Sequence, residues 1–236
     1  MGAGPEPFDR DVELNEGYRY TTNAPLSSRL ANDRLTDATL ELVALEGRRL
    51  IDVGCGDGTY TADLARRGSP TQVVGIDPSP RAVEVAARRH PELRFEVGDA
   101  AWLETTAERF DVAVARGVLH HADDPARLVR AIGRVADTAV VIEPNGWNPV
   151  LKMIERVSAY HRAHGERSWR SSVIDRWLRE AGLTPVVHTY AGLVPFFFPA
   201  PAARVLKAVE PLVESSGPLG RAALAVYAVR AERVKS

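Results

Sequence analysis

Hydrophobic residues alternate between two kinds of segment in the central part of the chain. Short, nearly continuous apolar runs are typical of strands buried on both faces, and apolar residues spaced three or four apart are typical of amphipathic helices. The predicted strands are 48–54, 71–77, 93–99, 111–117 and 138–144, and the predicted helices between them are 59–68, 79–90, 100–110 and 124–137. Four strand–helix units with such short crossovers predict a parallel sheet covered by helices on both faces.

The pattern changes at both flanks. We expect one domain over residues 1–236, with an N-terminal arm and helix (1–46) before the alternating part and an insertion (145–170) after it. The later elements are a helix from Ser171 or Ser172, either of which could cap it, then a strand, a helix and a final strand (171–182, 184–193, 198–216 and 221–232). The last two strands would form a hairpin that ends the sheet antiparallel.

Charge and cysteine content narrow the function classes. The chain has 30 Lys and Arg against 31 Asp and Glu, so no global field favours nucleic acid. The single cysteine, Cys55, excludes an intramolecular disulfide and fits a reducing compartment. With no signal-like start and no long apolar run, we expect a cytoplasmic protein without stable membrane insertion.

Glycines alternate directly after the first apolar run, in the stretch LIDVGCGDGT (50–59). Gly54, Gly56 and Gly58 predict a tight strand-to-helix turn whose backbone N–H groups approach a ligand, because no Cβ stands in the way. In an open α/β sheet this turn borders the crevice at the carboxyl ends of the strands. The alternative is a turn that binds nothing.

Carboxylates surround this turn. Asp77 ends the second run, where it can accept hydrogen bonds from both ribose hydroxyls. Asp52 and Asp57 flank the glycines, an arrangement that disfavours a diphosphate and suits a ligand with an ammonium and a sulfonium group. Asp99, after the third run, could accept from an adenine amino group. These residues predict a cationic nucleoside ligand.

The stretches LIDVGCGDGT, GIDPSP, EVGDA and FDVAVARGVLHHADDP, in that order, resemble the successive motifs of class I S-adenosylmethionine-dependent methyltransferases. The resemblance covers about residues 48–144. It implies a Rossmann-like, doubly wound α/β fold with a seven-stranded sheet of order 3-2-1-4-5-7-6, strand 7 antiparallel. It also implies S-adenosyl-L-methionine as the cofactor.

The same resemblance implies roles for individual residues. The glycines would lie against methionine and ribose, Asp52 would hold the amino group, and Arg116 would approach the methionine moiety through its carbonyl. We expect the arm and first helix (1–46), with Tyr18, Tyr20, Thr21 and Arg29, to fold over the cofactor, and the insertion (145–170) to cover the acceptor pocket. The full set of expected cofactor-binding residues is Tyr20, Arg29, Asp52, Gly54, Gly56, Asp77, Pro78, Asp99, Ala100 and Arg116.

Histidines supply the candidate catalytic groups. His120 and His121 follow the fourth run, and either could take a proton from a hydroxyl acceptor near neutral pH. Alternatively, one of them braces the loop before Asp123, which we expect to cap the next helix. In the insertion, His161 could orient the acceptor. His161 and His164 have no third ligand nearby, so no metal site is expected.

Two further features have two interpretations each. Glu143, at the end of the fifth run, either contacts substrate or is a hydrogen-bonded strand terminus. The apolar C-terminal segment 193–216 either binds a hydrophobic acceptor, or packs on the sheet, or forms a homodimer contact. Its predicted apolar helix face comprises Ala202, Val205, Leu206, Val209, Leu212 and Val213.

Together these observations predict methyl transfer to a small-molecule acceptor, at a hydroxyl oxygen of a natural product, quinone-like or lipid-like compound. Carbon or nitrogen acceptors stay open, as does a reaction that uses bound S-adenosylmethionine without methylating, such as decarboxylation or cyclisation. A non-catalytic nucleoside-binding protein is a further alternative. An NAD-dependent oxidoreductase is disfavoured by the glycine spacing.

Overall fold

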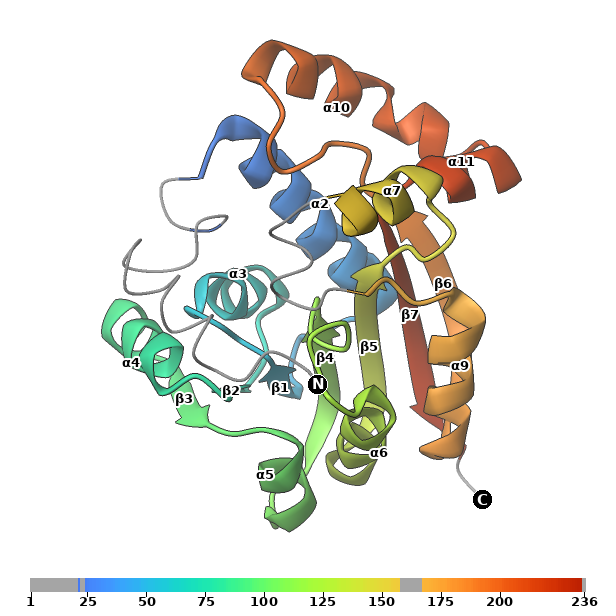
Figure 1. The fold of residues 1–236 in the computed structure, drawn as a ribbon. Coiled ribbons are helices and arrows are strands. Elements are labelled where there is room, and N and C mark those ends of the chain that lie inside the picture. The colour runs from blue at the N-terminus through green and yellow to red at the C-terminus, as the bar shows by residue number, and fades with distance from the viewer. Residues whose placement is uncertain (1–20, 22–23, 158–166, 235–236) are drawn as a thin grey trace.

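A seven-stranded sheet forms the centre of the molecule in the computed structural model, which describes residues 21, 24–157 and 167–234 (Figure 1). The strand order is β3-β2-β1-β4-β5-β7-β6, and β7 runs antiparallel to both of its neighbours. This confirms the predicted fold. The strands are β1 Arg49–Val53, β2 Gln72–Asp77, β3 Arg94–Val97, β4 Phe110–Arg116, β5 Ala136–Pro144, β6 Leu183–Ala191 and β7 Val226–Arg233.

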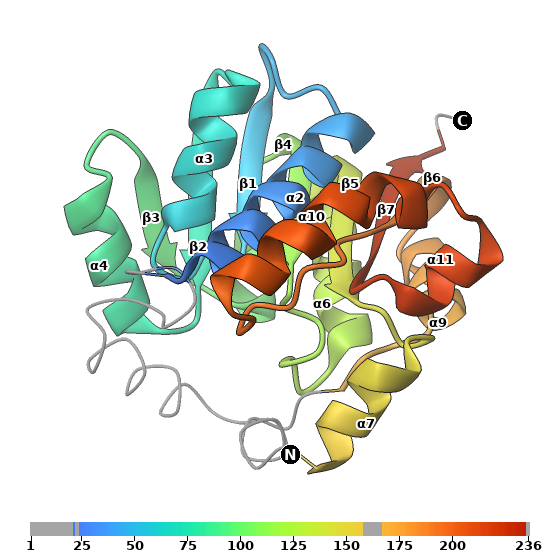
Figure 2. The ribbon, with the colours of Figure 1, turned by 90° about the horizontal axis from the view of Figure 1, so that it is seen from above.

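Helices cover the sheet on both faces (Figures 1 and 2). Leu50 of β1 packs in a core with the first helix, while its neighbour Ile51 packs in a second core with helices from the other face. This explains why the strands are continuously apolar. The helices are α2 Leu26–Leu42, α3 Thr59–Gly68, α4 Pro80–Arg89, α5 Ala100–Thr105, α6 Pro125–Val135, α7 Pro149–Val157, α9 Ser171–Glu180, α10 Ala200–Glu214 and α11 Pro218–Ala223.

Helix starts differ from the prediction at two places. Asp124, not Asp123, caps α6, because its side chain accepts from the Arg127 N–H. Neither predicted serine caps α9: the cap position is Arg170, and the Ser171 hydroxyl instead accepts from the Tyr190 hydroxyl. The adjacent strand therefore uses the serine that sequence alone assigned to the cap.

The C-terminal segment also departs from the prediction. Residues 221–223 belong to α11 rather than to the final strand, which begins at Val226. The helix α10 does not pack on the sheet with its predicted apolar face. It runs alongside α2 and contacts it, and Val205, Val209 and Leu212 are exposed (Figure 2). Among the described helices, none has the length and apolar composition to cross a bilayer.

Candidate active site

The glycine turn between β1 and α3 has a left-handed backbone. Gly54, Gly56 and Gly58 have φ values of +78°, +54° and +77°, which other L-residues rarely adopt. A Cβ on Gly54 would stand 2.3 Å from a methyl carbon of Val118, in the loop after β4. Glycine is therefore required at position 54 both by conformation and by the close approach of that loop.

The amides of this turn are directed into the protein. The N–H groups of Gly54 and Cys55 donate to the Ile76 carbonyl oxygen, at N···O distances of 2.7 and 3.0 Å. The Gly56 N–H donates to Asp77 Oδ2 at 3.0 Å. The expectation that these N–H groups face a ligand is wrong, because they fix the turn to β2. Because these N–H groups are bonded within the protein, they do not offer the set of backbone donors that would bind a diphosphate.

Asp77 joins the turn to the start of the next helix. Its Oδ2 accepts from Gly56, and its Oδ1 accepts from the Ser79 N–H at 2.9 Å. The carboxylate is buried at the carboxyl end of β2. A carboxylate has two acceptor oxygens, which is the kind of group that binds the hydroxyls of a ribose. Pro78, the next residue, is exposed beside it.

Asp52 is buried near the end of β1 and accepts a hydrogen bond from the Thr61 hydroxyl at 2.6 Å. Burial raises the pKa of Asp52 to about 6, against the opposing effects of Thr61 and of the Arg116 charge. A carboxylate that is costly to ionise gains from a nearby cationic group, so this position fits an ammonium ligand.

Asp57 is neutralised by the protein, although the sequence interpretation assigned it to a ligand cation. Its Oδ2 accepts from Arg89 at 3.1 Å and from the Thr21 hydroxyl at 2.5 Å. These contacts tie residue 21, before α2, to the glycine turn. Thr21 belongs to the arm that we expect to fold over the cofactor, whereas nothing in the sequence predicts Arg89, because no spacing indicates that α4 meets this turn.

Arg116 ends β4 with its side chain buried between helices. Its guanidinium donates to the Asn32 side chain at 2.9 Å and to the Thr36 hydroxyl at 3.3 Å. It also stacks over the Tyr60 ring at 3.8 Å. Burial lowers the pKa of Arg116, while the nearby Tyr60 and Asp52 raise it. The side chain thus holds α2 in place beside the crevice. The role expected for Arg116 beside the methionine moiety concerns its backbone carbonyl and stays a prediction.

Asp99 and Ala100 stand at the start of α5. Asp99 is exposed, and its Oδ1 accepts from the N–H groups of Ala101 and Trp102. Arg29 on α2 donates to the Ala24 carbonyl oxygen at 2.7 Å, so it braces the beginning of that helix. Tyr20 and His161 lie outside the described residues.

His120 is paired with a buried carboxylate. Glu143 Oε2 lies 2.8 Å from His120 Nδ1, and its Oε1 accepts from the N–H groups of Val118 and Leu119. Glu143 is fully buried at the end of β5, so the strand-terminus interpretation holds. A carboxylate at Nδ1 favours the tautomer that carries its proton there and its lone pair on Nε2. The His121 ring contacts the His120 ring in a tilted arrangement, with centroids 3.9 Å apart and an interplanar angle of 45°.

This histidine loop adjoins the glycine turn. Val118, two residues before His120, occupies the space beside Gly54 that a side chain would need. The structure therefore brings Asp52, Asp77, the glycine turn and the His120–Glu143 pair to one edge of the sheet, at the carboxyl ends of neighbouring strands β2, β1, β4 and β5.

Comparison with known proteins agrees with this geometry. A family model described as a methyltransferase domain matches residues 51–140, which contain β2, β3 and β4 completely and most of β1. The chain is 35% identical over 170 residues to a ubiquinone biosynthesis O-methyltransferase of Alkalilimnicola ehrlichii. It belongs to the class I S-adenosylmethionine-dependent methyltransferases. That alignment covers 64% of this chain and 66% of the relative.

Two further proteins resemble this chain, one in sequence and one in fold. A magnesium-protoporphyrin O-methyltransferase of Rhodobacter capsulatus is 37% identical over 135 residues, covering 54% of this chain and 53% of its own. The crystal structure of the cyclase SpnF superposes with a TM-score of 0.70 at 24% identity, covering 100% of this chain and 98% of that one. The latter similarity concerns the fold.

Proposed function

We propose that this methyltransferase transfers a methyl group from S-adenosylmethionine to a hydroxyl oxygen of a small molecule, with His120 as the general base. The observation that carries the proposal is the pairing of His120 with buried Glu143 in the loop that lies against the glycine turn. A base held beside the cofactor turn suits an acceptor that must lose a proton as it is methylated.

The cofactor fits the residues present. Asp52 would hold the amino group, because a cation relieves the burial cost of its carboxylate. Asp77, at the carboxyl end of β2 beside the glycine turn, would hold the ribose through its carboxylate, and Asp99 and Ala100 would border the adenine. When bound, the cofactor supplies a methyl group on a sulfonium, which needs positioning more than activation.

The remaining chemistry belongs to the chain's own residues. The lone pair on His120 Nε2 would accept the acceptor's proton, and the Glu143 carboxylate would stabilise the resulting imidazolium through Nδ1. His121 would restrict the His120 ring by its tilted contact with it. We assign His120 the catalytic role and His121 a positioning role.

The proposal extends to the segments that cover the site, to the class of acceptor and to the cellular compartment. We propose that the arm (1–46) and the insertion (145–170) cover the two ligands, in line with the Thr21–Asp57 bond. The relatives named above are a ubiquinone biosynthesis O-methyltransferase and a magnesium-protoporphyrin O-methyltransferase, which supports a small-molecule acceptor. The balanced charge and single cysteine support a cytoplasmic enzyme that does not act on nucleic acid.

The test is methyl transfer from a labelled donor to a panel of phenolic and other hydroxyl acceptors, with His120→Ala and a matched control, His188→Ala. His188 is an exposed histidine on β6. We expect His120→Ala to lower kcat about 100-fold or more at saturating cofactor, and His188→Ala to retain it. Equal turnover in both variants would remove the base role. A product with an unchanged formula would instead place the chain with the non-methylating members of the fold.

A further inference from the structure

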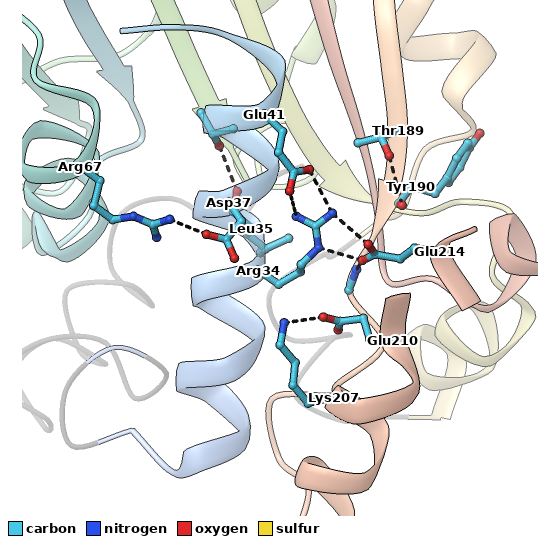
Figure 3. A network of polar contacts seen from close by, with 12 residues as sticks. Arg34, Leu35, Asp37, Glu41, Arg67, Thr189, Tyr190, Lys207, Glu210 and Glu214 are labelled. Carbon is cyan, nitrogen blue, oxygen red and sulfur yellow. Dashed lines mark hydrogen bonds and ion pairs between the residues drawn. The ribbon is translucent and has the colours of Figure 1, made fainter. Parts of the chain in front are cut away.

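The helix α10 has its carboxylates on the side that faces the protein and apolar residues on the side that faces solvent, the reverse of an ordinary surface helix. Its inward side carries two carboxylates: Glu210 is buried, and Glu214 is largely covered (Figure 3). Glu214 accepts from Arg34 of α2 at 2.8 Å and from the Gly192 N–H at 3.0 Å. Glu210 accepts from the Leu193 N–H at 2.8 Å and from Lys207. The polar groups of α10 are therefore used to attach it to α2 and to the segment after β6.

The outward side of α10 is apolar. Val205, Val209 and Leu212 recur at helical spacing on one face, with exposed fractions of 64%, 37% and 72%. A surface helix normally turns such a row toward the core and its charges toward water. These three residues form what we call the outer row of α10. Within the described residues no other element covers them.

The outward side of α10 also carries charge of one sign only, which is positive. The exposed positions of α10 include one charged residue, Arg204, and no carboxylate. Both of the helix's glutamates that could repel an anionic surface point inward, where Arg34 and Lys207 neutralise them. The exposed positions are Ala200, Pro201, Arg204, Val205, Ala208, Val209, Pro211 and Leu212.

The outer row leads toward the crevice. Just before α10, the Phe196 carbonyl oxygen accepts from both Ser27 and Ser28 at the start of α2, at 2.8 and 2.7 Å. The next ring, Phe197, is 61% exposed. Because Thr21, a few residues before α2, bonds to the glycine turn, this end of α10 lies on the crevice side of the molecule.

We propose that the outer row of α10, with Phe197, docks reversibly on a lipid bilayer surface. An apolar helix face without exposed carboxylates can settle into the boundary between headgroups and acyl chains without spanning the membrane. The row is only about 10 Å long, since the ends of its span, residues 205–212, are separated by seven helical rises of about 1.5 Å. That patch is small against the roughly 800 Å² per partner of a stable dimer, which favours a shallow lipid contact over a second copy of the chain.

Docking would serve the enzyme by bringing the crevice to a lipid-like acceptor, and this link alone rests on the proposed function. An acceptor dissolved in the bilayer would reach the site beside the Phe196–Phe198 segment without crossing bulk water. The docking itself rests on the apolar row and can be tested without any acceptor.

The experiment is flotation of the full-length chain with large unilamellar vesicles of phosphatidylcholine, with and without phosphatidylglycerol. The test variants are Val205→Ser and Leu212→Ser, singly and together, and the matched control is Val234→Ser, a 69% exposed valine after β7. We expect the native chain and the control to float with vesicles and the double variant to bind at least about tenfold more weakly, because two exposed apolar side chains leave the interface. With one exposed arginine on α10, phosphatidylglycerol should strengthen binding only modestly.

Three outcomes overturn the proposal: no flotation of the native chain, equal flotation of the double variant, or a dimer that the double variant converts to a monomer. The last outcome would assign the outer row to a second copy. Cofactor binding by calorimetry should be the same in all variants, which shows that they are folded. A chain that floats but never transfers a methyl group overturns the proposed function alone. One that methylates a water-soluble phenol but does not float overturns docking alone.

Discussion

At the scale of single residues, the site depends on a carboxylate that the fold makes expensive to ionise. Asp52 is surrounded by protein and has one hydrogen bond, from Thr61. Its pKa of about 6 lies above the ordinary value of 3.8, so the folded state binds more protons than the unfolded state between these values. Stability should therefore fall as pH rises through this window and stay reduced above pH 6.

Replacing Asp52 by Asn removes this cost and keeps an oxygen for the Thr61 hydroxyl. We expect Asp52→Asn to raise the free energy of unfolding by about 1–3 kcal/mol at pH 8 and to change it little near pH 4. Urea unfolding at both pH values is the measurement, with Asp33→Asn on the exposed side of α2 as the control. A variant less stable than the native chain at pH 8 would mean that the Asp52 charge is well solvated or paired.

Gly54 is constrained twice, by its φ of +78° and by Val118. We expect Gly54→Ala to destabilise the protein by about 2–4 kcal/mol, since left-handed strain and overpacking both contribute. Adding Val118→Ala should recover only the part of the lost unfolding free energy that comes from overpacking against Val118. Full recovery in chemical denaturation of the double variant would show that backbone strain is negligible, and no recovery would show that Val118 is not the obstacle.

At the scale of elements, the attachment of α10 to α2 depends on Arg34. Glu214 and Glu41 raise the pKa of Arg34 despite its burial, which on its own would lower the pKa. The guanidinium bonds to Glu214 through two nitrogens and to Glu41 through two, as Figure 3 shows. This arrangement holds together two helices that are 180 residues apart in the sequence at the point of contact.

Arg34→Ala leaves the largely buried Glu214 with the Gly192 N–H but without its cationic partner. We expect a loss of about 1–3 kcal/mol of unfolding free energy, and less when Glu214→Gln is added, because the unpaired charge is then gone. Arg66→Ala, which breaks an exposed pair on α3, should cost no more than about 0.5 kcal/mol. Equal losses in Arg34→Ala and Arg66→Ala would contradict the structural importance of this contact.

The elements that sequence predicted well are those whose pattern is local. The strands that are buried on both faces read as apolar runs, and the helices between them have clear spacing, so β1 through β5 were predicted within a few residues. The orientation of α10 could not be predicted, because its apolar face points outward and its glutamates find partners on α2 and after β6. The prediction that Ser171 caps α9 is wrong for a similar reason, since its hydroxyl accepts a hydrogen bond from Tyr190, a residue of another element.

At the scale of the whole molecule, the sheet order places the ends of β1, β2, β4 and β5 at one edge, where all candidate groups meet. The motif order in the sequence predicted the acidic residues and glycines of this edge, because each follows a strand. It did not predict how they are used: the turn amides bind β2, Asp57 binds Arg89, and Glu143 binds His120. Those partners are brought together by tertiary packing, which the spacing of residues along the sequence does not reveal.

The central claim is that this edge binds S-adenosylmethionine, and calorimetric titration of that compound into the purified chain tests it most directly. We expect saturable binding by the native chain and at least about tenfold weaker binding by Asp77→Ala, which loses the proposed ribose contact and one anchor of the glycine turn. Circular dichroism should show that the variant is folded. Equal affinity in both proteins, or binding of NAD in place of S-adenosylmethionine, would contradict the account.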